Sequence, residues 1–250
     1  MYHWSTYFDR TCYALSSFTK QIQMKNLAII PARGGSKRIP RKNVKPFLGK
    51  PMLAYPIKAA LETGLFEEVM VSTDDEEIAE VACQYGATVP FMRRAETAND
   101  YATLSDVLHE VLDNYERIGK SFDNMCCILA TSPLLHAADI SQGFRSLEES
   151  GFSTIVPIVQ YSYPILRSFK MDENGGIDYN WPEYAKSRSQ DLPAAYHDSG
   201  TFYWHKVALW RTGKISRGAI IVSEETVQDI DTEQDWKMAE VKYKIMYNMR

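Results

Sequence analysis

An apolar run that ends at a proline and opens into a loop rich in glycine and cations constrains this chain more than any other feature. Leu27 to Ile30 are continuously apolar, as in strands covered on both faces, and Pro31 cannot donate a ladder hydrogen bond. Gly34 and Gly35 lack a Cβ, so backbone N–H groups can approach an anion closely. Five cations lie within ten residues here: Arg33, Lys37, Arg38, Arg41 and Lys42. The pattern predicts a buried strand followed by an anion-binding loop, although an isolated charge run is more often a solvated turn.

The loop matches neither the P-loop spacing nor the dinucleotide-binding spacing, so residue types alone indicate a triphosphate or another polyanion. Beyond it, expected strands and helices alternate along the chain. The expected strands are 68–73, 88–92, 125–130, 154–159, 201–204 and 219–222, and the expected helices are 51–63, 76–85, 103–115, 139–150, 206–211 and 233–247. Such alternation predicts an α/β fold with a mostly parallel sheet, helices on both faces, and ligand bound beyond the carboxyl ends of the strands.

Two segments fall outside this alternation. Residues 160–195 are rich in Tyr, Pro, Ser and charged residues and contain Asn174-Gly175-Gly176, which predicts a hairpin turn within a lid or insertion. Residues 1–23 are aromatic and polar, and they lack the apolar centre of a signal peptide. We expect 1–23 to be an N-terminal extension outside the fold and 24–250 to form one domain.

Composition and charge limit the kinds of molecule that this chain is expected to bind. With a net charge of −4 and a pI near 5.8, the chain is not expected to bind nucleic acid, so the basic loop suits a small anionic ligand. No apolar stretch reaches the roughly 18 residues that a membrane span requires, so no membrane partner is expected. The four cysteines show no C-x-x-C spacing, which favours a reducing, cytoplasmic setting.

A second candidate site lies near the C-terminus. Asp229 and Asp231 are two residues apart, so on an extended segment both carboxylates project to the same side, where they would suit Mg²⁺. Alternatively, the two carboxylates bind no metal and only stabilise the N-terminus of the following helix, where negative charge is favourable. Thr232 can cap that helix. The sequence pattern alone leaves both interpretations open.

The string Pro31-Ala32-Arg33-Gly34-Gly35-Ser36-Lys37, followed by Pro40 and Lys42-Asn43, closely resembles the start of the acylneuraminate cytidylyltransferases. The resemblance continues through nearly the whole chain after Met24. It implies a Rossmann-like nucleotidyltransferase fold in which 160–195 form a small protruding subdomain that mediates homodimerisation. It also implies transfer of CMP from CTP to a nine-carbon α-keto sugar acid, with Mg²⁺ as cofactor.

The same resemblance implies site residues. The implied catalytic residues are Arg33, Lys37 and Asp231, and the implied metal ligands are Asp229 and Asp231. The implied nucleotide-binding residues are Ala32, Arg33, Gly34, Gly35, Ser36, Lys37, Asn43, Arg93, Thr131 and Ser132. Thr131-Ser132-Pro133-Leu134 matches the family's T-S-P-L, but Leu129-Ala130 replace the Gln-Pro that precedes it in sialate-type relatives. Recognition of the base must therefore be arranged differently here.

Residues 189–193 and 196–204 resemble the pseudaminate branch of this family, whereas sialate enzymes carry an Asn-Gly-Ala pattern. The implied acceptor is pseudaminate, and the implied product is a CMP-sugar for surface glycan or flagellin glycosylation. The implied sugar-binding residues are Gln190, Tyr196, His197, Asp198, Ser199 and Gly200. N-acetylneuraminate, legionaminate and ketodeoxyoctonate are alternative acceptors. A non-catalytic nucleotide-sugar binder is the alternative from another class, and it would need the basic loop but not the Asp229/Asp231 pair.

Overall fold

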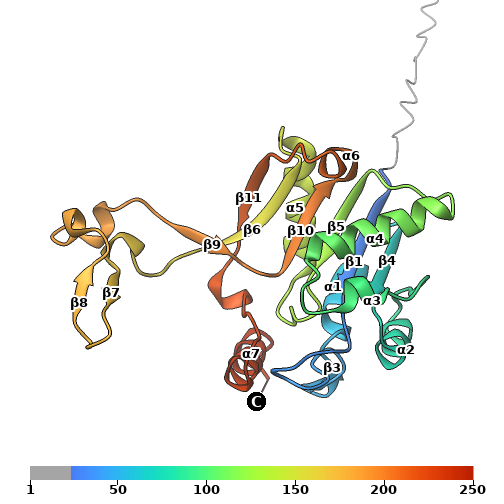
Figure 1. Cartoon of the computed structure of the whole chain (residues 1–250), viewed down its shortest axis with the longest axis horizontal. Helices are drawn as coiled ribbons and strands as arrows, with labels where there is room; N and C mark the ends of the chain where they lie inside the picture. The colour runs from blue at the N-terminus through green and yellow to red at the C-terminus, as the bar shows by residue number, and fades with distance from the viewer. Residues whose placement is uncertain (1–23, 250) are drawn as a thin grey trace, which may run out of the picture.

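The computed structural model describes residues 24–249, so the expected extension 1–23 lies outside the described residues. A seven-stranded sheet has the order β11-β6-β10-β5-β1-β4, with β9 paired to β6 (Figure 1). Its strands are β1 Asn26–Pro31, β4 Glu68–Ser72, β5 Asn124–Ile128, β6 Thr154–Gln160, β9 Tyr196–Asp198, β10 Phe202–Lys206 and β11 Arg217–Ile221. The helices are α1 Ala54–Glu62, α2 Glu76–Gln84, α3 Ala95–Ala98, α4 Leu104–Arg117, α5 Ala137–Glu149, α6 Val207–Arg211 and α7 Glu233–Met246. None of the helices within 24–249 is both long enough and apolar enough to cross a bilayer.

The sheet is mostly parallel, as expected. Strand β1 pairs in parallel with β4 and β5, and β11 pairs in parallel with β6. Strand β10 lies between β5 and β6 and is antiparallel to both. The chain returns to the sheet through β9, which is antiparallel to β6, and then continues in the same direction along β6 as β10. The two strands are joined around Gly200, where φ is +63°.

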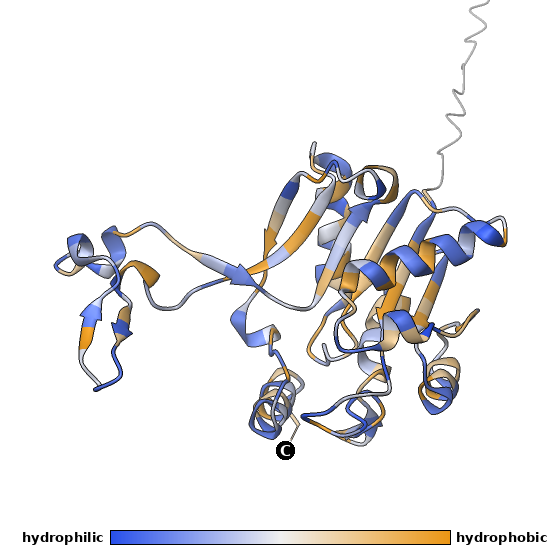
Figure 2. Cartoon of the chain, viewed as in Figure 1, coloured by the Kyte–Doolittle hydropathy of each residue, from blue (hydrophilic) through white to orange (hydrophobic). Residues whose placement is uncertain are grey.

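Helices cover both faces of the sheet, which confirms the predicted α/β architecture. In β1, the alternate side chains of Ala28 and Ile30 pack with residues of α1, α2 and α5. The side chains of Leu27 and Ile29 point to the opposite face and pack with α4 and α6. In Figure 2, β1, β4 and β5 are mainly apolar, whereas α4 alternates between apolar and hydrophilic residues along its length.

Two predicted elements are wrong. Residues 88–92 form only an isolated bridge between Thr88 and Met70, because Pro90 follows and cannot donate a ladder hydrogen bond. Helix α1 does not begin at Pro51. Instead, Pro51 lies in β3 (Lys50–Pro51), which pairs with β2 (Pro46–Phe47), and the helix starts three residues later.

Residues 161–195 form an arm that extends away from the sheet (Figure 1). Its centre is the hairpin of β7 Phe169–Met171 and β8 Ile177–Tyr179, which confirms the turn predicted at 174–176. Gly175 has φ +84°, a conformation that glycine adopts without strain. Three short 3₁₀ turns complete the arm: Ile165–Arg167, Pro182–Tyr184 and Ser189–Asp191. Large apolar side chains are exposed along it, among them Tyr163, Phe169, Met171 and Ile177.

His205 on β10 makes the stability of the fold depend on pH. Burial, with a smaller contribution from Arg217, lowers the pKa of His205 to about 4, and its Nδ1 lies 3.0 Å from Thr154 Oγ1. An unfolded chain binds this proton near pH 6.5, so the folded state loses stability as the pH falls from 6.5 toward 4. The loss should reach about 3 kcal/mol. Urea unfolding at pH 7.5, 6 and 5 measures it, and His205→Gln should show a smaller slope over this range; an unchanged slope would contradict the assignment.

Candidate functional site

A cavity of about 220 Å³ lies beyond the carboxyl ends of β1 and β5. It joins the basic loop, residues 33–43, to the segment that follows β5. The lining residues are Pro31, Arg33, Ser36, Lys37, Arg38, Ile39, Lys42, Asn43, Leu129, Ala130 and Thr131. The predicted anion-binding loop and the T-S-P-L segment therefore meet at the edge of the sheet where a parallel α/β fold binds ligands.

An apolar cluster, called here the anchor cluster, brings the predicted metal ligands to this loop. It consists of Ile39, Phe47, Met52, Ile230, Trp236 and Ala239. Ile39 belongs to the basic loop and is 1% exposed, while Ile230 lies between the two aspartates and is 0% exposed. Because Ile230 points into the cluster, its neighbours Asp229 and Asp231 point the other way, as the alternation of an extended segment requires.

Asp231 faces the cations of the loop. Its Oδ2 lies 2.8 Å from Arg38 Nη1, and its Oδ1 lies 3.8 Å from Lys42 Nζ. The helix-cap interpretation is not needed for α7, because Thr232 and Asp235 form a complete capping box there. The Asp231 carboxylate is therefore free of a capping role. It does not itself line the cavity, but it pairs with Arg38 and Lys42, two cations that do.

Lys42 is a site residue to which the sequence patterns assigned no separate role. Its Nζ donates a hydrogen bond of 2.6 Å to the carbonyl oxygen of Ile230. Burial lowers the pKa of Lys42 despite the opposing effect of Asp231 and Asp229. The sequence signals for Lys42 were its place among the five loop cations and beside Asn43 in the family motif, since burial of a charged side chain depends on the tertiary fold.

The aspartate pair fits Mg²⁺. Within residues 24–249, no group of three or more His, Cys, Asp or Glu side chains forms a set that could hold a metal on its own. Mg²⁺ commonly takes only one or two protein carboxylates and completes its shell with water and substrate phosphates. Asp229 and Asp231 supply such a pair, one on each side of the buried Ile230 in the sequence and both near Lys42, which lines the basic cavity.

Several predicted nucleotide-binding residues shape the loop. The Gly34 N–H donates to Asp74 Oδ1 at 2.9 Å, and a Cβ at Gly34 would lie 2.7 Å from Asp75 Oδ2. Asn43 is buried, and its Nδ2 donates to the carbonyl oxygen of Arg33 at 2.9 Å. Gly34 is therefore required by the close approach to the end of β4, whereas Gly35 has open space around its Cα and can approach a ligand.

Two further predicted residues lie behind the cavity. Arg93 is 8% exposed, and its guanidinium donates from Nε to Ser72 Oγ at 3.0 Å and from Nη2 to the Ser72 carbonyl oxygen. Ser132 is also buried, with its Oγ 3.4 Å from the Thr201 carbonyl oxygen. Neither residue lines the cavity, whereas Thr131 does.

The predicted sugar-binding segment contains one well-oriented carboxylate. Tyr203 Oη lies 3.0 Å from both oxygens of Asp198, and the Gly200 N–H donates to Asp198 Oδ1 at 2.8 Å. Burial and the adjacent Asp198 raise the pKa of Tyr203, and Asp229 makes a smaller contribution in the same direction. The Asp198 carboxylate is therefore held in place by its own strand connection and by β10.

The remaining predicted sugar-binding residues differ in their burial and in their location. Ser199 is buried and its Oγ lies 2.7 Å from Thr201 Oγ1, so it stabilises the connection between β9 and β10. The His197 ring packs 4.9 Å from Tyr161 between ring centres, and Tyr196 is 40% exposed. Gln190 belongs to the 3₁₀ turn Ser189–Asp191 of the arm.

Comparison with known proteins identifies relatives across the whole domain. Residues 27–203 match a family model described as cytidylyltransferase. The chain is 41% identical over 226 residues to the pseudaminic acid cytidylyltransferase of Campylobacter jejuni, covering 89% of this chain and 97% of that protein. It is 33% identical over 219 residues to N-acylneuraminate cytidylyltransferase B of Danio rerio, covering 85% of this chain and 50% of that protein.

A solved structure shares the fold. The structure of CMP:2-keto-3-deoxy-manno-octonic acid synthetase complexed with CTP matches with a TM-score of 0.64 at 19% identity. The match covers 90% of this chain and 99% of that chain.

Proposed function

Because this chain belongs to the cytidylyltransferase family, we propose that it transfers CMP from CTP to a nonulosonic acid, with pseudaminate as the acceptor, and releases pyrophosphate. As a member of that family the protein is a nucleotidyltransferase. The observation that carries the proposal is the cavity lined by the basic loop, whose cations Arg38 and Lys42 pair with Asp231. Identity to the Campylobacter jejuni protein over nearly its full length favours pseudaminate as the acceptor.

In the proposed reaction, the anomeric hydroxyl of the sugar acid attacks the α-phosphate of CTP, and the bond from that phosphate to pyrophosphate breaks. Arg33 and Lys37 would bind phosphate oxygens, and Lys42 would face the charge that develops on the leaving group. Asp229 and Asp231 would hold Mg²⁺, which would neutralise phosphate charge when bound. Catalysis would rest on positioning and charge neutralisation.

On the sugar side, Asp198 would accept hydrogen bonds from substrate hydroxyl or amide groups. Its carboxylate is already oriented by Tyr203 and by the N–H of Gly200, so little freedom would be lost on binding. A site built to hydrogen-bond particular groups rejects analogues that lack them.

A turnover screen tests the acceptor. Purified protein is given CTP, Mg²⁺ and either pseudaminate, N-acetylneuraminate, legionaminate or ketodeoxyoctonate, and pyrophosphate release is measured. We expect the highest kcat/KM with pseudaminate. A higher value with another sugar would reassign the acceptor, and nucleotide binding without pyrophosphate release from any sugar would indicate the non-catalytic binder.

We also propose that the protein is a homodimer formed through the arm, which carries exposed Met171 and Ile177. Light scattering at micromolar concentration should give twice the chain mass, and Ile177→Asp should shift the mass toward that of one chain. Ile118→Asp, at a residue 59% exposed compared with 65% for Ile177, is the matched control and should leave the dimer intact. A single-chain mass for the unmodified protein would contradict the dimer.

The proposed setting of the reaction is the cytoplasm. Cys126 and Cys127 on β5 support it: both are free thiols buried in the sheet, and burial raises the pKa of each. Unpaired buried cysteines are usual where the surroundings keep thiols reduced.

A further inference from the structure

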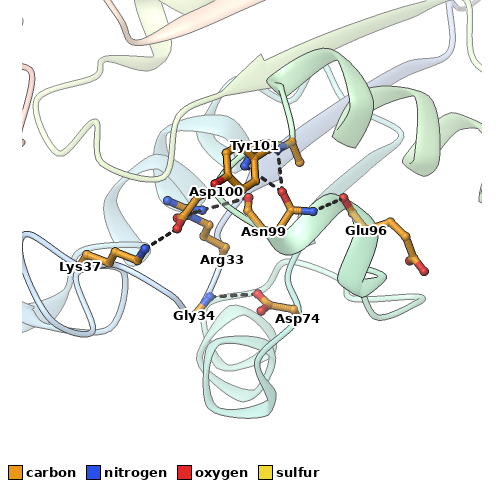
Figure 3. Close-up of polar contacts among 9 residues, drawn as sticks. Arg33, Gly34, Lys37, Asp74, Glu96, Asn99, Asp100 and Tyr101 are labelled. Carbon is orange, nitrogen blue, oxygen red and sulfur yellow. Dashed lines mark hydrogen bonds and ion pairs between the residues drawn. The ribbon is translucent and has the colours of Figure 1, made fainter.

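Arg33 and Lys37, the two cations proposed to bind phosphate oxygens, both contact the same carboxylate in the structure. Arg33 Nη1 donates to Asp100 Oδ1 at 2.8 Å and to the carbonyl oxygen of Asn99 at 3.1 Å. Lys37 Nζ forms an ion pair with the other carboxylate oxygen of Asp100. Figure 3 shows Asp100 between the two cations, so a single side chain bridges them.

The segment between α3 and α4 presents Asp100 in this position. Asn99 fixes the turn: its Oδ1 accepts from the N–H groups of Tyr101 and Ala102 at 2.8 and 3.0 Å, and its Nδ2 donates to the Glu96 carbonyl oxygen at 2.7 Å (Figure 3). Helix α4 then starts with a capping box at Thr103. None of these contacts uses the Asp100 carboxylate, so the turn does not need that carboxylate for its shape.

The bridge is accessible to solvent. The side chains of Arg33, Lys37 and Asp100 are 37%, 77% and 43% exposed. Exposed ion pairs are weak and exchange readily, and a polyphosphate carries more negative charge than one carboxylate. A phosphate that enters the cavity can therefore displace Asp100 from both cations.

We propose that Asp100 is the exchangeable counter-ion of the triphosphate site. It orients Arg33 and Lys37 between turnovers, releases them to the phosphates of CTP, and pairs with them again as pyrophosphate leaves. Asp100 thus acts as a positioning residue that weakens anion binding and speeds product release. The inference rests on the proposed nucleotide site.

The experiment removes the charge and keeps the shape of the side chain. Binding of inorganic pyrophosphate and tripolyphosphate to the full chain is measured by calorimetry for the unmodified protein and for Asp100→Asn. We expect Asp100→Asn to bind both anions roughly tenfold more tightly, since two exposed pairs no longer compete, and the difference should shrink at high salt. Inhibition of turnover by pyrophosphate should strengthen by a similar factor.

Asp113→Asn is the matched control. Asp113 on α4 pairs with Arg211 at 2.8 Å, and its side chain is 45% exposed, compared with 43% for Asp100. The Asp113→Asn variant loses one negative charge and an ion pair, as Asp100→Asn does, but its partner Arg211 lies outside the basic loop. Its affinity for both anions should therefore stay unchanged. If Asp113→Asn also bound the two anions about tenfold more tightly, the effect would come from net charge alone, and the proposal would be overturned.

Other outcomes separate this inference from the proposed function. Unchanged or weaker pyrophosphate binding by Asp100→Asn would overturn the counter-ion, and weaker CTP binding as well would make Asp100 a direct contact of the nucleotide. The anion measurement does not require catalysis. Tighter pyrophosphate binding by Asp100→Asn in a protein that turns over no sugar would support the counter-ion and reject the proposed reaction.

Discussion

Replacing Lys42 by methionine should lower kcat/KM for CTP by about a thousandfold while leaving the protein folded. The Lys42 ammonium lies in the cavity lining, where it donates to the carbonyl oxygen of Ile230 and faces Asp231. Removing one preorganised donor aimed at developing charge typically lowers turnover by about 10² to 10³, and here a full positive charge is lost as well. Methionine has a similar length, so the apolar stem of the side chain is retained.

The neighbouring Lys45 supplies the control for this substitution. Lys45 Nζ pairs with Glu233 at 2.6 Å and lies 4.7 Å from the centre of the Trp236 ring, but it does not line the cavity. Lys45→Met should therefore affect thermal unfolding more than turnover. Steady-state kinetics and thermal unfolding of both variants are compared with the unmodified protein. Equal losses of turnover in the two variants would show that Lys42 acts only through the general charge of the loop.

Asp231→Asn should lower turnover by about a hundredfold or more, because the loss of a metal-directed charge removes several kcal/mol of transition-state stabilisation. The fold should survive, since Thr232 and Asp235 cap α7 without the Asp231 side chain. The concentration of Mg²⁺ needed for half-maximal rate should rise, and this readout would not respond to a purely structural role. Near-normal activity at saturating Mg²⁺ would remove Asp231 from the proposed metal site.

Glu233→Gln is the corresponding control. It makes the same change from carboxylate to amide two residues further along the chain, and it removes only the ion pair with Lys45. Its rate and Mg²⁺ dependence should match those of the unmodified protein. A hundredfold loss in Glu233→Gln would point to electrostatics of the α7 N-terminus in place of metal binding.

The sequence predicted the elements whose local pattern and tertiary role agree. The apolar runs of β1, β4 and β5 and the helical spacing of α4 identified the core and both faces of the sheet. The direction of β10 could not be predicted, because an apolar run has the same pattern in either direction. The strand expected at 88–92 failed for a local reason, since Pro90 limits pairing to one bridge.

Prediction of the site was limited by contacts between distant segments. The family motif identified the cavity-lining residues Arg33, Lys37 and Thr131. It also placed Gly34 and Arg93 at the nucleotide, but their partners, Asp74 and Ser72, come from the end of β4 and become visible only in the folded chain. The same applies to the burial of Lys42, which depends on a segment 188 residues away in the sequence.

The separation of 188 residues between Lys42 and Ile230 affects the chain while the ribosome is still making it. Ile39 and Ile230 meet in the anchor cluster, so the basic loop leaves the ribosome long before the segment that carries Asp229 and Asp231. At roughly 5 to 20 residues per second, the delay is on the order of 10 to 40 s. During this interval Arg38 and Lys42 lack their carboxylate partner Asp231, and they can attract any polyanion nearby. Arg33 and Lys37 have an earlier partner, Asp100. The site is therefore complete, and able to act on its substrates, only when the last helix, α7, has packed against the loop.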